Sequence, residues 1–148
     1  MTNSLNTLFQ RDLDKVTTEL SEYKEENQIW VINKHISNSA GNLALHICGN
    51  LQYYVGTILG NSDYIRNREL EFSSSSVPLN RIKKEIIITK EVVNSILTTI
   101  TPATLQQGYP IEIFGHPMTT EFFLLHLSTH LSYHLGQINY HRRLLSTH

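Results

Sequence analysis

Apolar side chains recur at helical intervals along most of the chain. The first such pattern predicts an amphipathic helix over about residues 5–26, with charged residues between Leu8, Leu13, Val16, Leu20 and Tyr23. A second helix is predicted over about residues 40–59. It follows the potential N-cap run Ser37-Asn38-Ser39 and precedes the turn-forming run Gly60-Asn61-Ser62-Asp63. Further helices are predicted from Pro78 or Asn80 to about Ile100, and from Thr119 or Thr120 to about Leu145.

The connections between these helices are of three kinds. The short apolar run 29–32 is strand-like in composition and predicts an extended connector packed on the helices. Residues 64–78, rich in charged residues and serine, are expected to form an ordered crossover. Residues 101–120 contain prolines and glycines around the alternating stretch 111–114, which predicts a loop or a small hairpin across one end. The pattern therefore predicts an all-α fold, a single four-helix-bundle domain over residues 1–148 with long crossover connections.

Composition narrows the classes of function without selecting one. The 148 residues are enough to bury a sizeable core, and the net charge of −1 gives no basic surface for a nucleic acid or an anionic membrane. Cys48 is the only cysteine, which excludes an internal disulfide and fits a reducing compartment. The first 20 residues do not resemble a secretory leader, and no apolar run approaches 18 residues. We therefore expect a cytoplasmic protein with no nucleic-acid or membrane partner.

Two histidines on the last predicted helix are the leading candidates for chemistry. His130 and His134 are four residues apart, so their side chains are neighbours on one helical face. On a helical wheel they fall on the inward apolar stripe, where a polar ring needs a hydrogen-bond or metal partner. His46 lies on the apolar side of the second predicted helix and supplies a third imidazole. Three neutral imidazoles with an open position are a common catalytic arrangement for zinc, so His46, His130 and His134 are predicted to hold a metal.

The other histidines and Cys48 fit a metal site less well. His126 lies two helical turns before His134, and imidazoles spread over about 12 Å cannot share one ion with bonds of about 2.1 Å. It is predicted to be a partly exposed helix residue, and His141 a structural or second-site residue. Cys48 is two residues from His46, on the other side of the helix, and is predicted to be a small core residue. The remaining histidines lie in loops or at the last position: His35, His116 and His148.

Three polar residues are candidates for support around the metal. Asn50 and Tyr53 follow His46 at i+4 and i+7, and Gln137 lies about one turn after His134. Each could hydrogen-bond a metal ligand or a bound water, although Tyr53 could equally be a core aromatic with a polar edge. Gly49 leaves space for a neighbouring helix or a bound group. The chain has no Ser/His/Asp pattern, Gly-rich phosphate loop or CxxC motif.

Four sequence motifs together resemble the DinB/YfiT-like superfamily of metal-binding four-helix bundles, in one of its uncharacterised branches. They are GNLALHICGNL (41–51), ELEF (69–72), IFGHPMT (113–119) and HLSYHLGQI (130–138). The resemblance implies a divalent metal, often nickel or zinc, on His46, His130 and His134. It also implies a homodimer, and among relatives it includes enzymes that use a low-molecular-weight thiol.

Two classes of function follow. The first is a metal-dependent enzyme, either an S-transferase using a low-molecular-weight thiol or a hydrolase using water. The second is a non-catalytic metal-binding or sensor protein. A structural zinc site is usually closed by four protein ligands, and only three good candidates are found here, which favours an open site.

Overall fold

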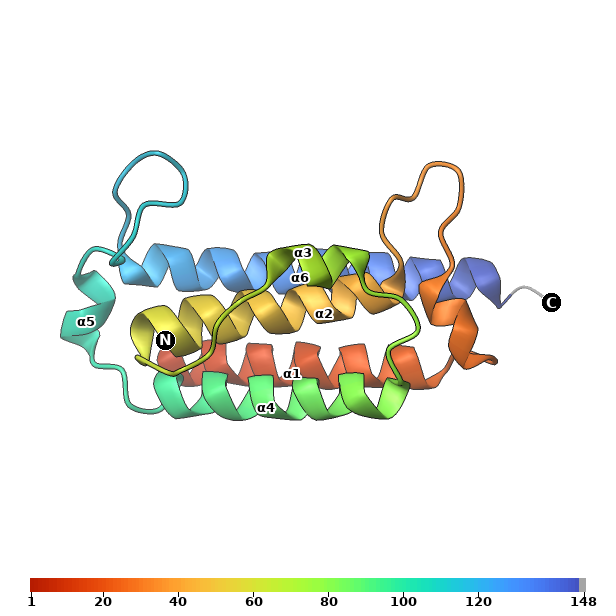
Figure 1. The fold of residues 1–148 in the computed structure, drawn as a ribbon. Helices are drawn as coiled ribbons and strands as arrows, with labels where there is room; N and C mark the ends of the chain where they lie inside the picture. Colours follow the sequence, from red (N-terminus) through yellow and green to blue (C-terminus); the bar gives the residue numbers. More distant parts are fainter. Residues whose placement is uncertain (147–148) are drawn as a thin grey trace.

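The computed structural model describes residues 1–146, and His148 lies outside this range. In this range the chain forms six α-helices, four of them long, and no β-strand (Figure 1). None of the described helices is long and apolar enough to cross a membrane. The all-α fold class is confirmed at this level. The α-helices are α1 (Thr2–Ser21), α2 (Ala40–Leu51), α3 (Arg68–Ser73), α4 (Leu79–Leu97), α5 (Pro102–Gln106) and α6 (Thr120–Leu145).

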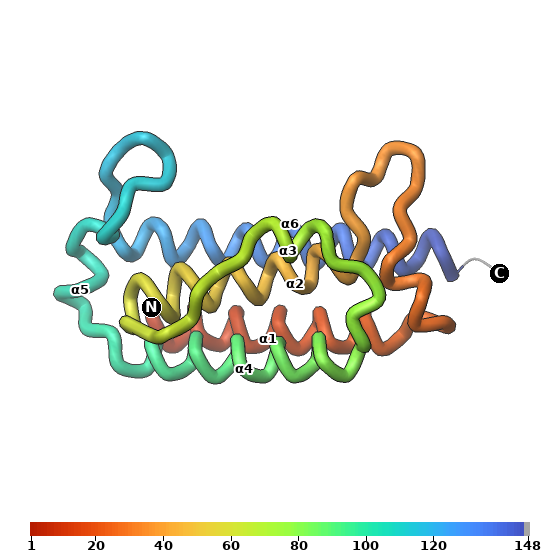
Figure 2. The backbone as a smooth tube through the Cα atoms, viewed as in Figure 1, coloured from red at the N-terminus to blue at the C-terminus, as the bar shows by residue number. Residues whose placement is uncertain are grey.

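The four long helices pack side by side around one apolar core (Figure 2). Helix α1 packs against α4 and α6, and α2 packs against α4, α6 and the short α3. Phe9 on α1 and Phe123 on α6 are among the largest fully buried side chains. Leu8, which the apolar pattern placed on the inward stripe, is 38% exposed and Phe9 takes the buried position instead.

Helix α2 begins at the predicted N-cap, because the Ser39 hydroxyl accepts a hydrogen bond from the Asn42 amide at 3.1 Å. From Gln52 to Leu59 the same helix continues as a π-helical segment, η2. It stops after Gly60, where Asn61 adopts the left-handed conformation with φ of 52°. The wider π-helical turn changes which side chains share a face beyond Leu51, which affects the site described below.

Two predicted helix ends and one connector differ in the structure. Helix α1 ends at Ser21 and α4 at Leu97, earlier than the apolar periodicity suggested. The first half of the run 29–32, predicted to be extended, belongs to a 3-10 helix, η1 (Glu26–Trp30), whereas Val31 is extended. A capping box between Glu25 and Gln28 starts η1, and Ile29 anchors it in the core.

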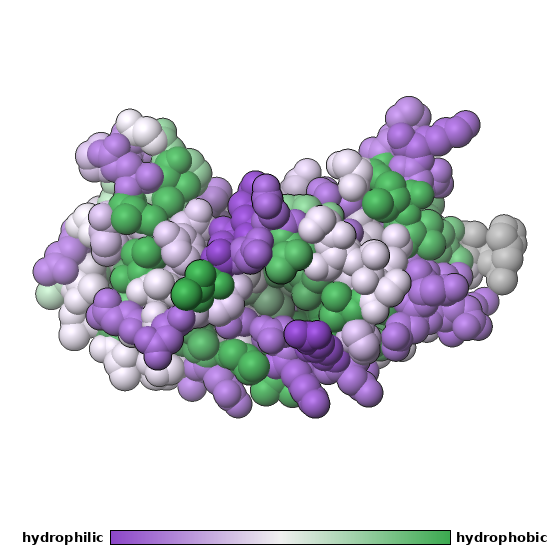
Figure 3. All heavy atoms as spheres, viewed as in Figure 1, coloured by the Kyte–Doolittle hydropathy of each residue, from purple (hydrophilic) through white to green (hydrophobic). Residues whose placement is uncertain are grey.

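The two long connections carry the short helices. Helix α3 lies within the predicted crossover, and the buried Asn42 holds it against α2 by donating to the carbonyls of Glu71 (2.9 Å) and Ser74 (2.8 Å). Helix α5 starts the connection to α6, and a single antiparallel bridge between Gly108 and Thr119 closes the loop that follows. This loop and the connection before α2 rise on the same side, with α3 between them (Figures 1 and 2). The surface is hollowed between these projections (Figure 3).

Candidate metal centre

Three histidines from two helices converge beneath α3. His46 projects from the middle of α2, and His130 and His134 project from consecutive turns of α6. Nε2 of His130 lies 3.2 Å from Nε2 of His46 and 3.0 Å from Nε2 of His134. The potential ligand atoms of the three residues all lie within 4.8 Å of one another. The structure thus brings together the three histidines that the sequence singled out, in a cluster that could hold a divalent metal.

The outer ring nitrogens of two of these histidines have acceptor partners. Nδ1 of His46 lies 3.0 Å from Oε1 of Glu71, and Nδ1 of His134 lies 2.7 Å from Oε1 of Gln137. Carboxylate and amide oxygens can only accept here, so each Nδ1 carries the proton. Nη2 of Arg66 also lies 3.3 Å from Nδ1 of His46, but its shorter contact, 2.9 Å, is the hydrogen bond it donates to Oε1 of Glu71. In neutral imidazoles, Nε2 of His46 and of His134 therefore presents a lone pair toward His130. Such outer hydrogen bonds commonly fix the tautomer of metal-binding histidines.

A cation fits this arrangement better than hydrogen bonding among the rings. Nε2 of His130 can donate at most one proton, so with neutral rings at most one of its two close contacts can be a full hydrogen bond. A cation at the centre would satisfy all three nitrogens. Three ligands about 2.1 Å from a tetrahedral zinc lie about 3.4 Å apart, close to the two observed nitrogen separations. The residues present therefore fit a divalent metal with at least one position open.

Burial keeps the α6 histidines in the neutral form that a metal requires. It lowers the pKa of His130 to about 3, with a further lowering from the neighbouring His134 and His46. Burial also lowers the pKa of His134, against the opposing effect of its hydrogen bond with Gln137. Both rings are therefore deprotonated at neutral pH, and no proton has to be displaced from them when a cation binds.

Glu71 on α3 is a supporting residue that sequence reasoning missed. Its carboxylate is buried and also accepts two hydrogen bonds from Arg66, from Nε at 2.9 Å and from Nη2 at 2.9 Å. Burial alone would raise the pKa of Glu71, but the hydrogen bonds from His46 and Arg66 outweigh it and hold the pKa below its ordinary value. Glu71 is therefore ionised and orients His46. Phe72, the next residue on α3, packs against the imidazole ring of His46, with ring centroids 4.7 Å apart.

Gly49 makes room for this carboxylate. A Cβ atom at Gly49 would overlap Oε2 of Glu71 and would lie 2.6 Å from its Cδ. The group whose approach the glycine was expected to permit is thus the Glu71 side chain. The charged pair Arg66 and Glu71 in the crossover was the available sequence signal, but a six-residue helix has too little periodicity to place it.

The three predicted supporting residues occupy different positions. Gln137 lies against His134, as described above. Asn50 is buried one turn after His46, and its Oδ1 has no hydrogen-bond partner among the described residues. Tyr53 packs on Tyr54, with ring centroids 5.0 Å apart, and it is Tyr54 that lines the pocket next to His46. Tyr53 does not line that pocket, so its support of the metal site stays a prediction.

The other histidines that the structure describes lie outside the cluster. His141 is buried and structural, because Tyr23 and the carbonyl of Val31 hydrogen-bond its two ring nitrogens at 2.6 Å and 2.8 Å. His126 is half-buried and stacks on Phe123, and it lines the pocket beside the cluster without joining it. His35 and His116 are exposed.

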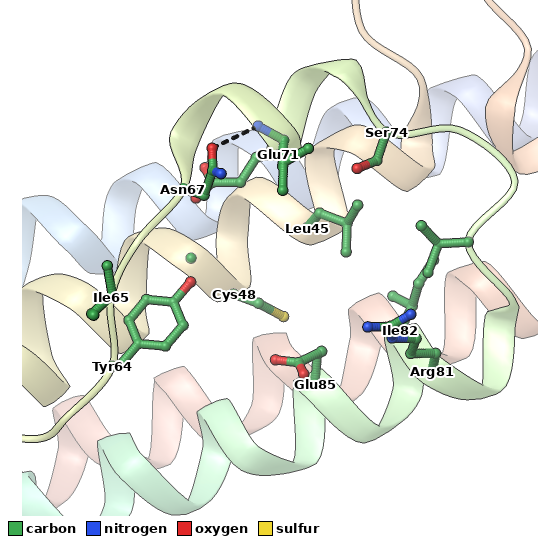
Figure 4. Close-up of a pocket in the computed structure, with 13 residues that line it drawn as sticks. Leu45, Cys48, Tyr64, Ile65, Asn67, Glu71, Ser74, Arg81, Ile82 and Glu85 are labelled. Atoms are coloured by element: carbon green, nitrogen blue, oxygen red, sulfur yellow. Dashed lines mark hydrogen bonds between the residues drawn. The ribbon is translucent and has the colours of Figure 1, made fainter.

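Cys48 points into a separate pocket of about 470 Å³ between the crossover and α4 (Figure 4). None of the three clustered histidines lines this pocket. Burial raises the pKa of its thiol to about 12, so the thiol stays protonated at neutral pH. Glu71 lines the same pocket and so stands between it and His46. A role for Cys48 as a nucleophile at the metal centre has no geometric support.

Neither a protein-family model nor a curated protein matches the chain. The structure shows an all-helical protein with a cluster of three histidines that could bind a divalent metal. Glu71 and Gln137 contact two of these histidines through hydrogen bonds.

Proposed function

We propose that the protein is a divalent-metal-binding helical bundle of the DinB/YfiT-like type, and that its metal centre serves a metal-dependent transfer reaction. The observation that carries the proposal is the convergence of three Nε2 atoms, with the outer nitrogens of His46 and His134 donating to Glu71 and Gln137. Nickel or zinc is the metal that the family resemblance and the all-imidazole ligand set favour.

His46, His130 and His134 would hold the metal. Among the described residues, no further His, Cys, Asp or Glu joins them as a fourth ligand. A divalent ion there would lower the pKa of a bound thiol or water and so supply a nucleophile at neutral pH. The Glu71–Arg66 pair keeps His46 in the required tautomer, and Gln137 does the same for His134.

S-transfer with a low-molecular-weight thiol is the reaction we favour. The thiol sulfur forms a bond to an electrophilic carbon, the leaving group departs with its electron pair, and the thiol proton passes to solvent. The protein's own thiol is protonated and faces another pocket, so the thiol has to be exogenous. Hydrolysis with water as nucleophile, and a metal-binding or sensor role without turnover, are the alternatives.

A substrate screen separates these three functions. Zinc- and nickel-loaded protein is incubated with small thiols and an aryl halide, and separately with an ester and no thiol. Thiol-dependent product formation that is lost in His134→Ala supports the transferase, and thiol-independent ester cleavage indicates the hydrolase. Full metal loading without turnover in either assay would favour the non-catalytic role.

A further inference from the structure

A second pocket, of about 290 Å³, adjoins the histidine cluster. His46 and His130 form one end of it, and its walls come from α2 and its π-helical continuation, the crossover, the loop before α6 and the first turns of α6. Any molecule in this pocket would lie next to two of the three candidate metal ligands.

Asn50 marks the polar part of this pocket. It is only 7% exposed, it lines the pocket, and its Oδ1 has no partner among the described residues. A buried amide oxygen that lacks a hydrogen bond destabilises a folded protein. Because Oδ1 can only accept, a ligand with an O–H or N–H donor close to the histidines would supply the missing partner.

The charge around the pocket is positive. Two arginines, Arg66 and Arg68, line the pocket, and none of the described residues that line it is acidic. The charge of Arg66 is matched by Glu71, with which it forms an ion pair at 2.9 Å. Arg68 is exposed and lies over the Phe72 ring, 5.2 Å from its centroid, and forms no ion pair with a described residue. Arg68 is therefore available to a negative charge at the pocket rim.

Another part of the pocket wall is aromatic. Phe114 contacts His126 edge-on with centroids 4.8 Å apart, and Phe123 stacks on His126 at 5.8 Å. Tyr54 meets Phe123 edge-on at 5.1 Å and extends the same wall. Offset and edge-on faces of this kind favour a flat apolar body.

We infer that this pocket binds a small organic anion with a flat apolar body and an O–H or N–H donor. The donor would hydrogen-bond Oδ1 of Asn50 near the histidines, and the negative charge would lie near Arg68 at the rim. The inference rests on the proposed metal centre, and it names the substrate class that the centre would take.

Calorimetric titration of the zinc-loaded protein with three probes tests the inference. 4-Hydroxybenzoate has the ring, the charge and a hydroxyl donor; benzoate lacks the donor, and 4-hydroxybenzamide lacks the charge. We expect 4-hydroxybenzoate to bind about tenfold more tightly than either of the other two, about 1.4 kcal/mol for that ratio. Arg68→Gln should abolish the preference for 4-hydroxybenzoate over 4-hydroxybenzamide, whereas Arg81→Gln, a change at the other pocket, should leave it intact.

Asn50→Leu separates a ligand-binding role from a structural one. Leucine has a similar volume and no unpaired polar atom, so the ligand-free protein should melt at an unchanged or higher Tm, while 4-hydroxybenzoate binds at least about tenfold more weakly and loses its advantage over benzoate. A lower Tm with unchanged 4-hydroxybenzoate affinity would overturn the inference, as would equal binding of the three probes or no binding of any. Zinc binding without 4-hydroxybenzoate binding overturns this inference alone, and failure to bind zinc overturns the metal centre and this inference together.

Discussion

Nδ1 of His46 donates a hydrogen bond to Oε1 of Glu71 at 3.0 Å, although the two residues are 25 positions apart and lie on different helices. Through this bond the crossover controls the orientation of a potential metal ligand on α2. Asn42 fixes α3 from below, Gly49 admits the carboxylate, and Arg66 balances its charge. The crossover is therefore part of the site.

Removing the negative charge of Glu71 should weaken metal binding without removing a ligand. We expect Glu71→Gln to lower zinc affinity by about 10–100-fold, because the amide no longer stabilises the Nδ1-protonated tautomer of His46 as strongly. Competition with a chromogenic chelator measures the affinity. Glu69→Gln, an exposed carboxylate on the same helix, is the matched control and should bind zinc like the wild type. Equal affinities for the two variants would contradict the role given to Glu71.

Gln137 should act in the same way on His134, with a smaller effect because it is exposed to water, which can replace it. We expect Gln137→Leu to lower zinc affinity by about tenfold. Ser132→Ala, an exposed change on the same helix, provides the baseline. If Gln137→Leu binds zinc as tightly as that control, the contact has no bearing on the metal.

The metal-free protein should lose stability between pH 7 and pH 5. The pKa values of His130 and His134 are lowered in the folded state, so below about pH 6.5 the unfolded chain takes up protons that the folded chain does not. Unfolding is then favoured as the pH falls, by about 1–2 kcal/mol at pH 5 for a fully depressed histidine. Urea unfolding of chelator-treated protein measures this.

This pH range lies above the ordinary pKa of Glu71, which is lowered further in the fold, so Glu71 does not contribute to the loss. His130→Gln should show a smaller fall between pH 7 and pH 5, and the exposed His35→Gln the same fall as the wild type. Identical pH profiles for all three proteins would show that the histidines do not titrate as described.

Cys48 should be dispensable for the metal centre. Cys48→Ser places a hydroxyl in the core, at a cost of about 1–3 kcal/mol in the free energy of unfolding, but zinc affinity should be unchanged. Metal titration and chemical unfolding of the same preparation separate the two effects. A large loss of zinc affinity with the fold intact would place the thiol in the site after all.

A homodimer remains a prediction, and α6 offers the surface for it. Four apolar side chains on one exposed face of this helix are between 45% and 67% exposed: Phe122, Leu125, Tyr133 and Tyr140. A two-fold interface through this face predicts a mass near twice 17.0 kDa by light scattering. Tyr133→Glu with Tyr140→Glu should give monomers, and Ser95→Glu on α4 should not. A monomer mass for the wild type at all concentrations would refute the dimer.

The sequence predicted those features of the fold and the site that are formed by residues close together in the chain. The helical stripe, the Ser39 cap and the i,i+4 histidine pair each depend on residues within a few positions of one another. Glu71 could not be placed in this way, because its partner on α2 is brought close only by the tertiary fold. The π-helical segment after Leu51 was also missed, because the apolar pattern predicted one regular helix to about residue 59.

The metal content of histidine variants tests the central claim most directly. Elemental analysis of purified protein after incubation with zinc and desalting should give one zinc per chain for the wild type and for the control His116→Ala. Single alanine variants of His46, His130 and His134 should retain much less, and the triple variant none, while circular dichroism still reports a folded helical protein. Stoichiometric zinc in the folded triple variant would contradict the account.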